Sequence, residues 1–230
     1  MLVSAPTVIL TDSVNDPEAE LWFAEPAGFT SLPLDGLLPE PGSPAADTLR
    51  TAVAPFLDAA PNEMVRQQFI SHFASGQQLL WALREVGTVH CSIGLHRDDV
   101  DEAGMNSGQP LLSLFTLSWR DTAVAPRGVT AARALAVNEG RTHIEYLELP
   151  CGPATFSESV CTPSADSGLP QLSLLQVHAH LPHPDCKRLV VLTLSTTAVA
   201  RREQYRAVLQ QIAETVSFDD PLVPGTSEAR

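Results

Sequence analysis

The residues with the clearest capacity for chemistry lie close together near the C-terminal end of the sequence. Three histidines and a cysteine, side chains that commonly bind zinc, occur within one short segment: His178, His180, His183 and Cys186. If this segment begins as a strand, His178 and His180 point to the same face, and a following turn could bring the other two back toward it. A metal-binding protein or metalloenzyme built on these four residues is therefore one hypothesis.

The spacing of these residues is not typical of a structural zinc site. Such sites take paired ligands from separate places in the chain, and this sequence has neither a Cys-x-x-Cys nor a His-x-x-x-His pair. The simpler interpretation places the histidines in solvent, on an edge strand and the turn that follows it. We therefore expect no bound metal and no other cofactor.

The other common signatures of catalysis are missing from the sequence. It contains no Gly-x-Ser-x-Gly turn and no Gly-x-Gly-x-x-Gly loop, and its single lysine, Lys187, does not follow a glycine as a phosphate-binding loop requires. His143 and Glu145 share a strand face, but no third group completes an acid-base site. Cys91 and its neighbour His90 would point to opposite faces of a strand, so Cys91 is expected to be a small buried side chain. These observations predict a protein that is not an enzyme.

Charge and composition exclude further classes of function. The 230 residues include 14 basic and 27 acidic side chains, and the net charge of −13 opposes binding to nucleic acid or anionic lipid. The longest apolar runs, such as residues 189–192, are far shorter than the roughly 20 residues that cross a bilayer, so no membrane insertion is expected. Residues 1–6 show no secretory signal, which predicts a cytoplasmic protein with reduced cysteines.

The spacing of apolar residues predicts an α+β protein. Two helices are expected over residues 43–60 and 61–87, and a final helix over 200–216. From residue 88 the pattern changes to a period of two; Val89, Cys91, Ile93 and Leu95 would form the buried face of the first strand. The remaining elements are a short helix at 130–138 and strands at 111–119, 141–149, 154–162, 171–181 and 189–195. Because successive strands are joined by hairpin-length connections, the sheet should be antiparallel, with helices covering one or both of its faces.

The predicted organisation is one domain over residues 1–218 with a helical insert at about 45–85, followed by a flexible tail at 219–230. Apolar side chains of the insert also lie outside the stripe that would face the sheet: Met64, Ile70, Leu79 and Trp81. They need another cover, which could be the proline-rich connector at residues 33–44, a second copy of the chain in a homodimer, or a protein partner. These four residues are the predicted partner-binding surface.

The C-terminal third of the sequence combines a strand and proline-containing turn at residues 176–185, a strand at 188–196 that ends in Leu-Thr-Leu-Ser-Thr, and a helix from 204 that leads to Phe218. In these features it resembles the Mog/PsbP-like superfamily, and most closely its actinobacterial LpqN-like proteins. Gly28 and Phe29 look like part of the group's opening hairpin, so the match covers about residues 20–218. LpqN proteins carry a lipid-anchor cysteine behind a signal, whereas the first cysteine here is Cys91, so the resemblance does not imply envelope anchoring.

This resemblance implies an antiparallel β-sheet sandwiched between helices in an α-β-α arrangement. It also implies an accessory or adaptor protein that binds a protein partner, in a setting linked to a secretion or envelope system. Two alternatives remain beside this function. One is the metal site described above, and the other is a small-molecule binder that uses a cleft between the sheet and the helical insert.

Overall fold

The computed structural model describes residues 8–10, 20–58, 60–97, 110–136, 142–162 and 172–220. Within these ranges the main feature is a seven-stranded antiparallel sheet with the strand order β3-β4-β5-β9-β8-β7-β6. The strands are β3 (Phe29–Ser31), β4 (Thr88–Arg97), β5 (Pro110–Asp121), β6 (Thr142–Leu149), β7 (Gly152–Cys161), β8 (Leu174–Pro182) and β9 (Arg188–Thr196). A separate antiparallel pair joins β1 (Val8–Leu10) to β2 (Ala24–Pro26). The predicted α+β class is confirmed.

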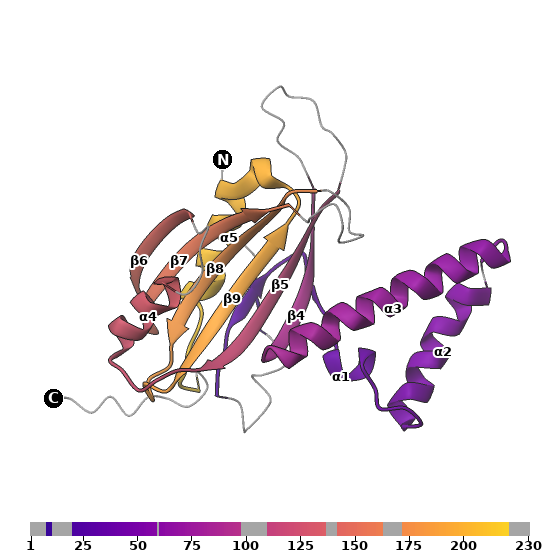
Figure 1. The fold of residues 1–230 in the computed structure, drawn as a ribbon, viewed down its shortest axis with the longest axis horizontal. Helices are drawn as coiled ribbons and strands as arrows, with labels where there is room; N and C mark the ends of the chain where they lie inside the picture. The colour runs from indigo at the N-terminus through magenta and orange to yellow at the C-terminus, as the bar shows by residue number, and fades with distance from the viewer. Residues whose placement is uncertain are drawn as a thin grey trace.

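Helices α4 (Arg127–Ala136) and α5 (Arg202–Glu214) lie on opposite faces of the sheet (Figure 1). The alternation of β8 explains the two layers. Its residues Val177 and Ala179 belong to the same buried cluster as α5, whereas His178 and His180 point to the face where α4 lies. The other described helices, α1 (Leu34–Leu37), α2 (Pro44–Asp58) and α3 (Glu63–Glu85), come from the N-terminal part of the chain.

The hydrophobic core fills the space between the sheet and α5. Phe115 of β5 pairs with Leu194 of β9, and both side chains are fully buried. Leu209 and Ile212 of α5 belong to the same buried cluster. Their spacing of three residues places both side chains on one side of the helix. The predicted apolar stripe of the terminal helix is therefore the face that packs on the sheet.

The predicted inward face of β4 is correct only in part. Cys91 is fully buried and Ile93 is half-buried, but Val89 and Leu95 are 56% and 60% exposed. Polar residues that alternate with them, such as Ser92, are also buried. His90 lies against the rings of Phe23 and Phe115. Polar side chains can occupy this face because they find partners there, as the next subsection describes.

Helices α2 and α3 form an angled pair that projects away from the sheet instead of covering it (Figure 1). The Asn62 side chain accepts a hydrogen bond from the Val65 amide and so caps the start of α3. The other end of α3 turns into β4 through Gly87, which has a φ of +84°. A Cβ at this position would collide with the carbonyl oxygen of Trp119, so the joint requires glycine.

Candidate functional site

The predicted partner-binding residues Met64, Ile70, Leu79 and Trp81 lie on α3, and we call them together the hairpin surface. At about 3.6 residues per turn, Ile70 and Trp81 lie on one side of the helix and Met64 and Leu79 on the other. Their exposed fractions run from 41% for Ile70 to 66% for Met64. The connector reaches α3 nearby, where the Gln77 amide donates a 2.8 Å hydrogen bond to the carbonyl of Leu37. It does not cover the surface, because Trp81 remains 55% exposed.

The same helix is almost free of charge. Between Arg66 and Arg84 its sequence contains no Asp, Glu, Lys or Arg. This contrasts with a net charge of −13 for the whole chain. A projecting helix with exposed apolar side chains and little charge is the kind of surface that binds another apolar surface.

The structure does not bring His178, His180, His183 and Cys186 into one ligand set. His178 and His180 lie on β8 under α4, where each ring has its own partner: His178 Nδ1 is 3.0 Å from Thr193 Oγ1, and His180 Nδ1 is 3.3 Å from the carbonyl of Thr155. The other two residues lie in the turn after β8. Among the described residues, no group of three or more His, Cys, Asp or Glu side chains could hold a metal ion.

The interpretation of these histidines as solvent-facing residues of an edge strand is also wrong. β8 lies inside the sheet, between β7 and β9. His180 is buried, and His178 is half-buried beside it. The alternation correctly placed the two rings on one face, but it could not show that a helix covers that face.

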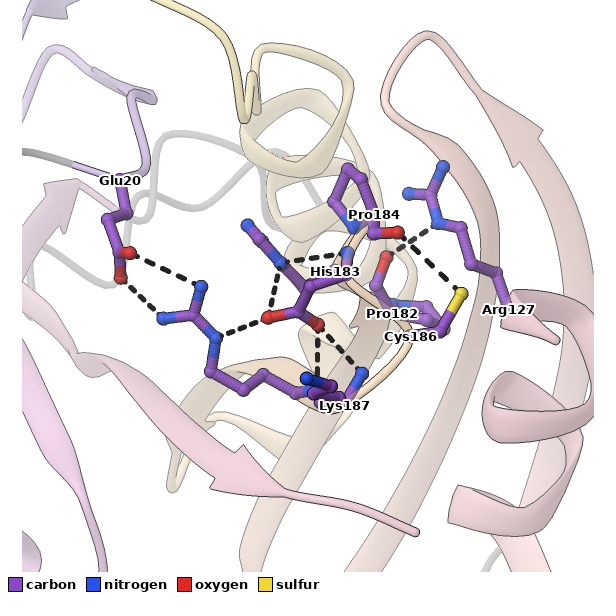
Figure 2. Close-up of polar contacts among 9 residues, drawn as sticks. Glu20, Arg127, Pro182, His183, Pro184, Cys186 and Lys187 are labelled. Atoms are coloured by element: carbon purple, nitrogen blue, oxygen red, sulfur yellow. Dashed lines mark hydrogen bonds and ion pairs between the residues drawn. The ribbon is translucent and has the colours of Figure 1, made fainter. Parts of the chain in front are cut away.

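The turn between β8 and β9 is held by a dense set of polar contacts (Figure 2). One oxygen of Asp185 accepts hydrogen bonds from the backbone amides of Lys187 and Arg188, at 2.7 and 3.1 Å. Its other oxygen accepts from Arg188 Nε at 2.7 Å and lies 3.0 Å from His183 Nδ1. The Arg188 guanidinium also binds Glu20 and lies over the ring of Trp119. Because these groups satisfy one another, we assign the turn a structural role.

The stability of this turn should depend on pH through Asp185. Burial alone would raise the pKa of this carboxyl, but hydrogen bonds from Lys187, Arg188 and His183 outweigh it and hold the pKa well below its ordinary value. A carboxyl whose pKa is lower in the folded state stabilises the fold above its unfolded pKa, and this contribution is lost as the pH falls.

We therefore expect Asp185→Asn to be less stable than the wild type at pH 7, with the difference shrinking as the pH falls below about 4. Urea unfolding of both proteins between pH 7 and pH 3 would measure this difference. Asp47→Asn, in an exposed pair on α2, is the control and should show little pH-dependent difference. A difference for Asp185→Asn that stays constant over this range would contradict the assignment.

A second buried polar group joins β2 to β4, and no sequence motif predicts it. Glu25 Oε1 accepts a 2.5 Å hydrogen bond from Ser92 Oγ and lies 2.9 Å from His90 Nε2. In a serine-hydrolase triad the histidine lies between the serine and the carboxylate, whereas here the carboxylate lies between the other two. Nearby, burial and then the charge of Glu25 raise the pKa of the Cys91 thiol to about 11, so this cysteine stays protonated.

A cavity of about 330 Å³ lies beneath α4, on the face of the sheet opposite α5. We call it the α4 cavity; its lining includes His178 and His180 of β8, Arg120 near the end of β5 and Arg133 of α4. The predicted small-molecule cleft was instead between the sheet and the helical insert. The two arginines are separate in the sequence and belong to no motif, so only the fold shows that they share a site.

Comparisons with known proteins identify no relatives: no protein-family model, curated protein or solved structure matches the chain. The resemblance to the Mog/PsbP-like superfamily therefore stays a prediction. No helix in the described part of the chain is both long enough and apolar enough to span a membrane.

Proposed function

We propose that the protein is a non-catalytic accessory protein that binds a protein partner through the hairpin surface. The observation that carries this proposal is the exposure of Leu79 and Trp81 on a helical pair that projects from the sheet. A helix that only stabilised the fold would bury its large apolar side chains against the sheet. In α3 only Leu80 is buried among the described side chains.

The properties of α3 also indicate what kind of partner it binds. Its uncharged stretch gives no electrostatic attraction to a charged ligand, so the binding energy must come from burying apolar area. Tryptophan is among the residues that contribute most to such interfaces. We propose a partner that presents an apolar, weakly charged helical surface.

The proposal includes the finer assignments suggested by the resemblance: a Mog/PsbP-like α-β-α domain, a cytoplasmic location and a role linked to a secretion or envelope system. The position of α4 and α5 on opposite sides of an antiparallel sheet supports the first of these. The second and third rest on the sequence alone.

Replacing Leu79 and Trp81 together with glutamine tests the proposal. We expect this double variant to keep its fold, because both side chains are about half exposed, and to bind the partner at least about tenfold more weakly. Leu172→Gln is a matched control, since this leucine is 58% exposed away from the hairpin and should leave binding unchanged.

The partner would be identified with a photo-crosslinking amino acid at position 81 of the full chain in cells. Its affinity for the purified wild type, double variant and control would then be measured by calorimetry. A cross-linked product of twice the mass of the chain would assign the surface to a homodimer. Unfolding of the double variant would show that this face is part of the core and would overturn the proposal.

A further inference from the structure

We infer that the α4 cavity binds a small organic carboxylate, which is a site distinct from the hairpin surface. The cavity is bounded on one side by strands β8 and β9 and on the other by α4 and the chain after β5. Its volume of about 330 Å³ is at the lower end of the range for ligand pockets. That volume holds on the order of ten water-sized groups, which suits a small molecule and is too little for a nucleotide.

The lining of this cavity carries more positive than negative charge. Arg120 and Arg133 both line it, and neither guanidinium makes a hydrogen bond or ion pair with another described residue. Arg188 and Arg206, by contrast, are paired with carboxylates. Asp121 is the single acidic residue of the lining among those described, so the arginines leave an excess of positive charge. In a chain with a net charge of −13, this local excess favours an anion.

A buried hydroxyl supplies the second, independent observation. Thr130 of α4 is only 5% exposed and lines the cavity, and its Oγ1 has no hydrogen-bond partner within the described structure. Thr122 Oγ1, in the same lining, is also a buried oxygen without a hydrogen-bond partner among the described residues. Buried hydroxyls without partners are rare in folded proteins because they lose their bonds to water. An oxygen of a bound carboxylate would accept a hydrogen bond from Thr130.

The apolar residues of the lining favour an organic anion over an inorganic one. The lining contains the apolar side chains of Leu189 and Val191 of β9 and of Ala123 and Ala134. Inorganic phosphate would leave this apolar area in contact with water. A carboxylate with a short aromatic or aliphatic body would bury it, while its charged end meets the two guanidinium groups.

Benzoate and hexanoate are suitable probes for the full-length protein, with benzyl alcohol and inorganic phosphate as comparison compounds. Titration followed by two-dimensional NMR should show saturable shifts for amides of α4, β8 and β9 with at least one of the carboxylates. Benzyl alcohol lacks the charge and phosphate lacks the apolar body, so each should bind at least about tenfold more weakly.

Two variants test the residues. Arg133→Gln removes one exposed cation and Thr130→Val removes the hydroxyl at nearly constant volume; each should weaken carboxylate binding, the first by about tenfold or more. Arg50→Gln, on the exposed side of α2, is the control and should bind as the wild type does. Absence of saturable binding by both carboxylates, equal binding of phosphate, or an unchanged affinity in Arg133→Gln would each overturn the inference. None of these outcomes bears on the hairpin surface, so the two proposals are tested separately.

Discussion

Leu209→Ala is expected to lower the free energy of unfolding by about 2 to 5 kcal/mol, the range measured when a buried leucine is truncated. Leu209 is fully buried where α5 packs on the sheet. The substitution removes apolar area from the core and leaves a cavity that rigid strands on one side cannot fill. Urea denaturation monitored by circular dichroism would measure the change.

The same substitution on α3 provides the control. Leu79 is 54% exposed on the hairpin surface, so Leu79→Ala should change the free energy of unfolding by no more than about 0.5 kcal/mol. If Leu209→Ala cost as little as Leu79→Ala, the α5 stripe would not be the core of this fold.

Arg206→Met is expected to cost about 3 to 5 kcal/mol, because it leaves a buried carboxylate without its main partner. Glu158 of β7 is 3% exposed, and its Oε2 accepts a 2.8 Å hydrogen bond from Arg206 Nη2 of α5. This ion pair joins α5 to β7. Methionine keeps much of the length of the arginine side chain but not its charge.

Arg202→Met is the matched control for this pair. Arg202 also contacts Glu158, at 3.5 Å, but its side chain is 45% exposed, so the loss should be no more than about 1 kcal/mol. Combining Arg206→Met with Glu158→Gln should recover part of the stability, since the amide does not carry a charge into the interior. Equal costs for the two arginine variants would contradict the geometry described for Glu158.

Local patterns predicted the elements of this fold well. The two-residue period located β4, a stretch apolar on both faces located β5, and the helical period located α3 and α5, because each signal lies within one short segment. Hairpin-length connections also predicted that neighbouring strands pair. They could not predict that β9 lies between β5 and β8, because that contact joins segments about 75 residues apart in the chain.

The errors have a common physical cause, which is that a polar residue can be buried when its partner comes from another element. The alternation in β4 made Val89, Cys91, Ile93 and Leu95 the inward residues, and only the two at the ends are exposed. It could not show that Glu25 on β2 would bind His90 and Ser92 and so allow polar residues of β4 to be buried. The α4 cavity was missed for a related reason, since its lining comes from several segments that only the fold brings together.

α3 joins the sheet at Gly87, and its contact with Leu37 through Gln77 lies in the half of the helix nearer that joint, so the far half forms an arm. With 23 residues and a rise of about 1.5 Å per residue, α3 extends about 35 Å from its joint at Gly87. A tilt of about ten degrees at that joint would move the far end of the helix by about 6 Å. An arm of this length is comparable to the diameter of a small domain, so a partner could occupy it without reaching the opposite end of the sheet. The protein could then hold two different ligands at the same time, one on the arm and one beneath α4.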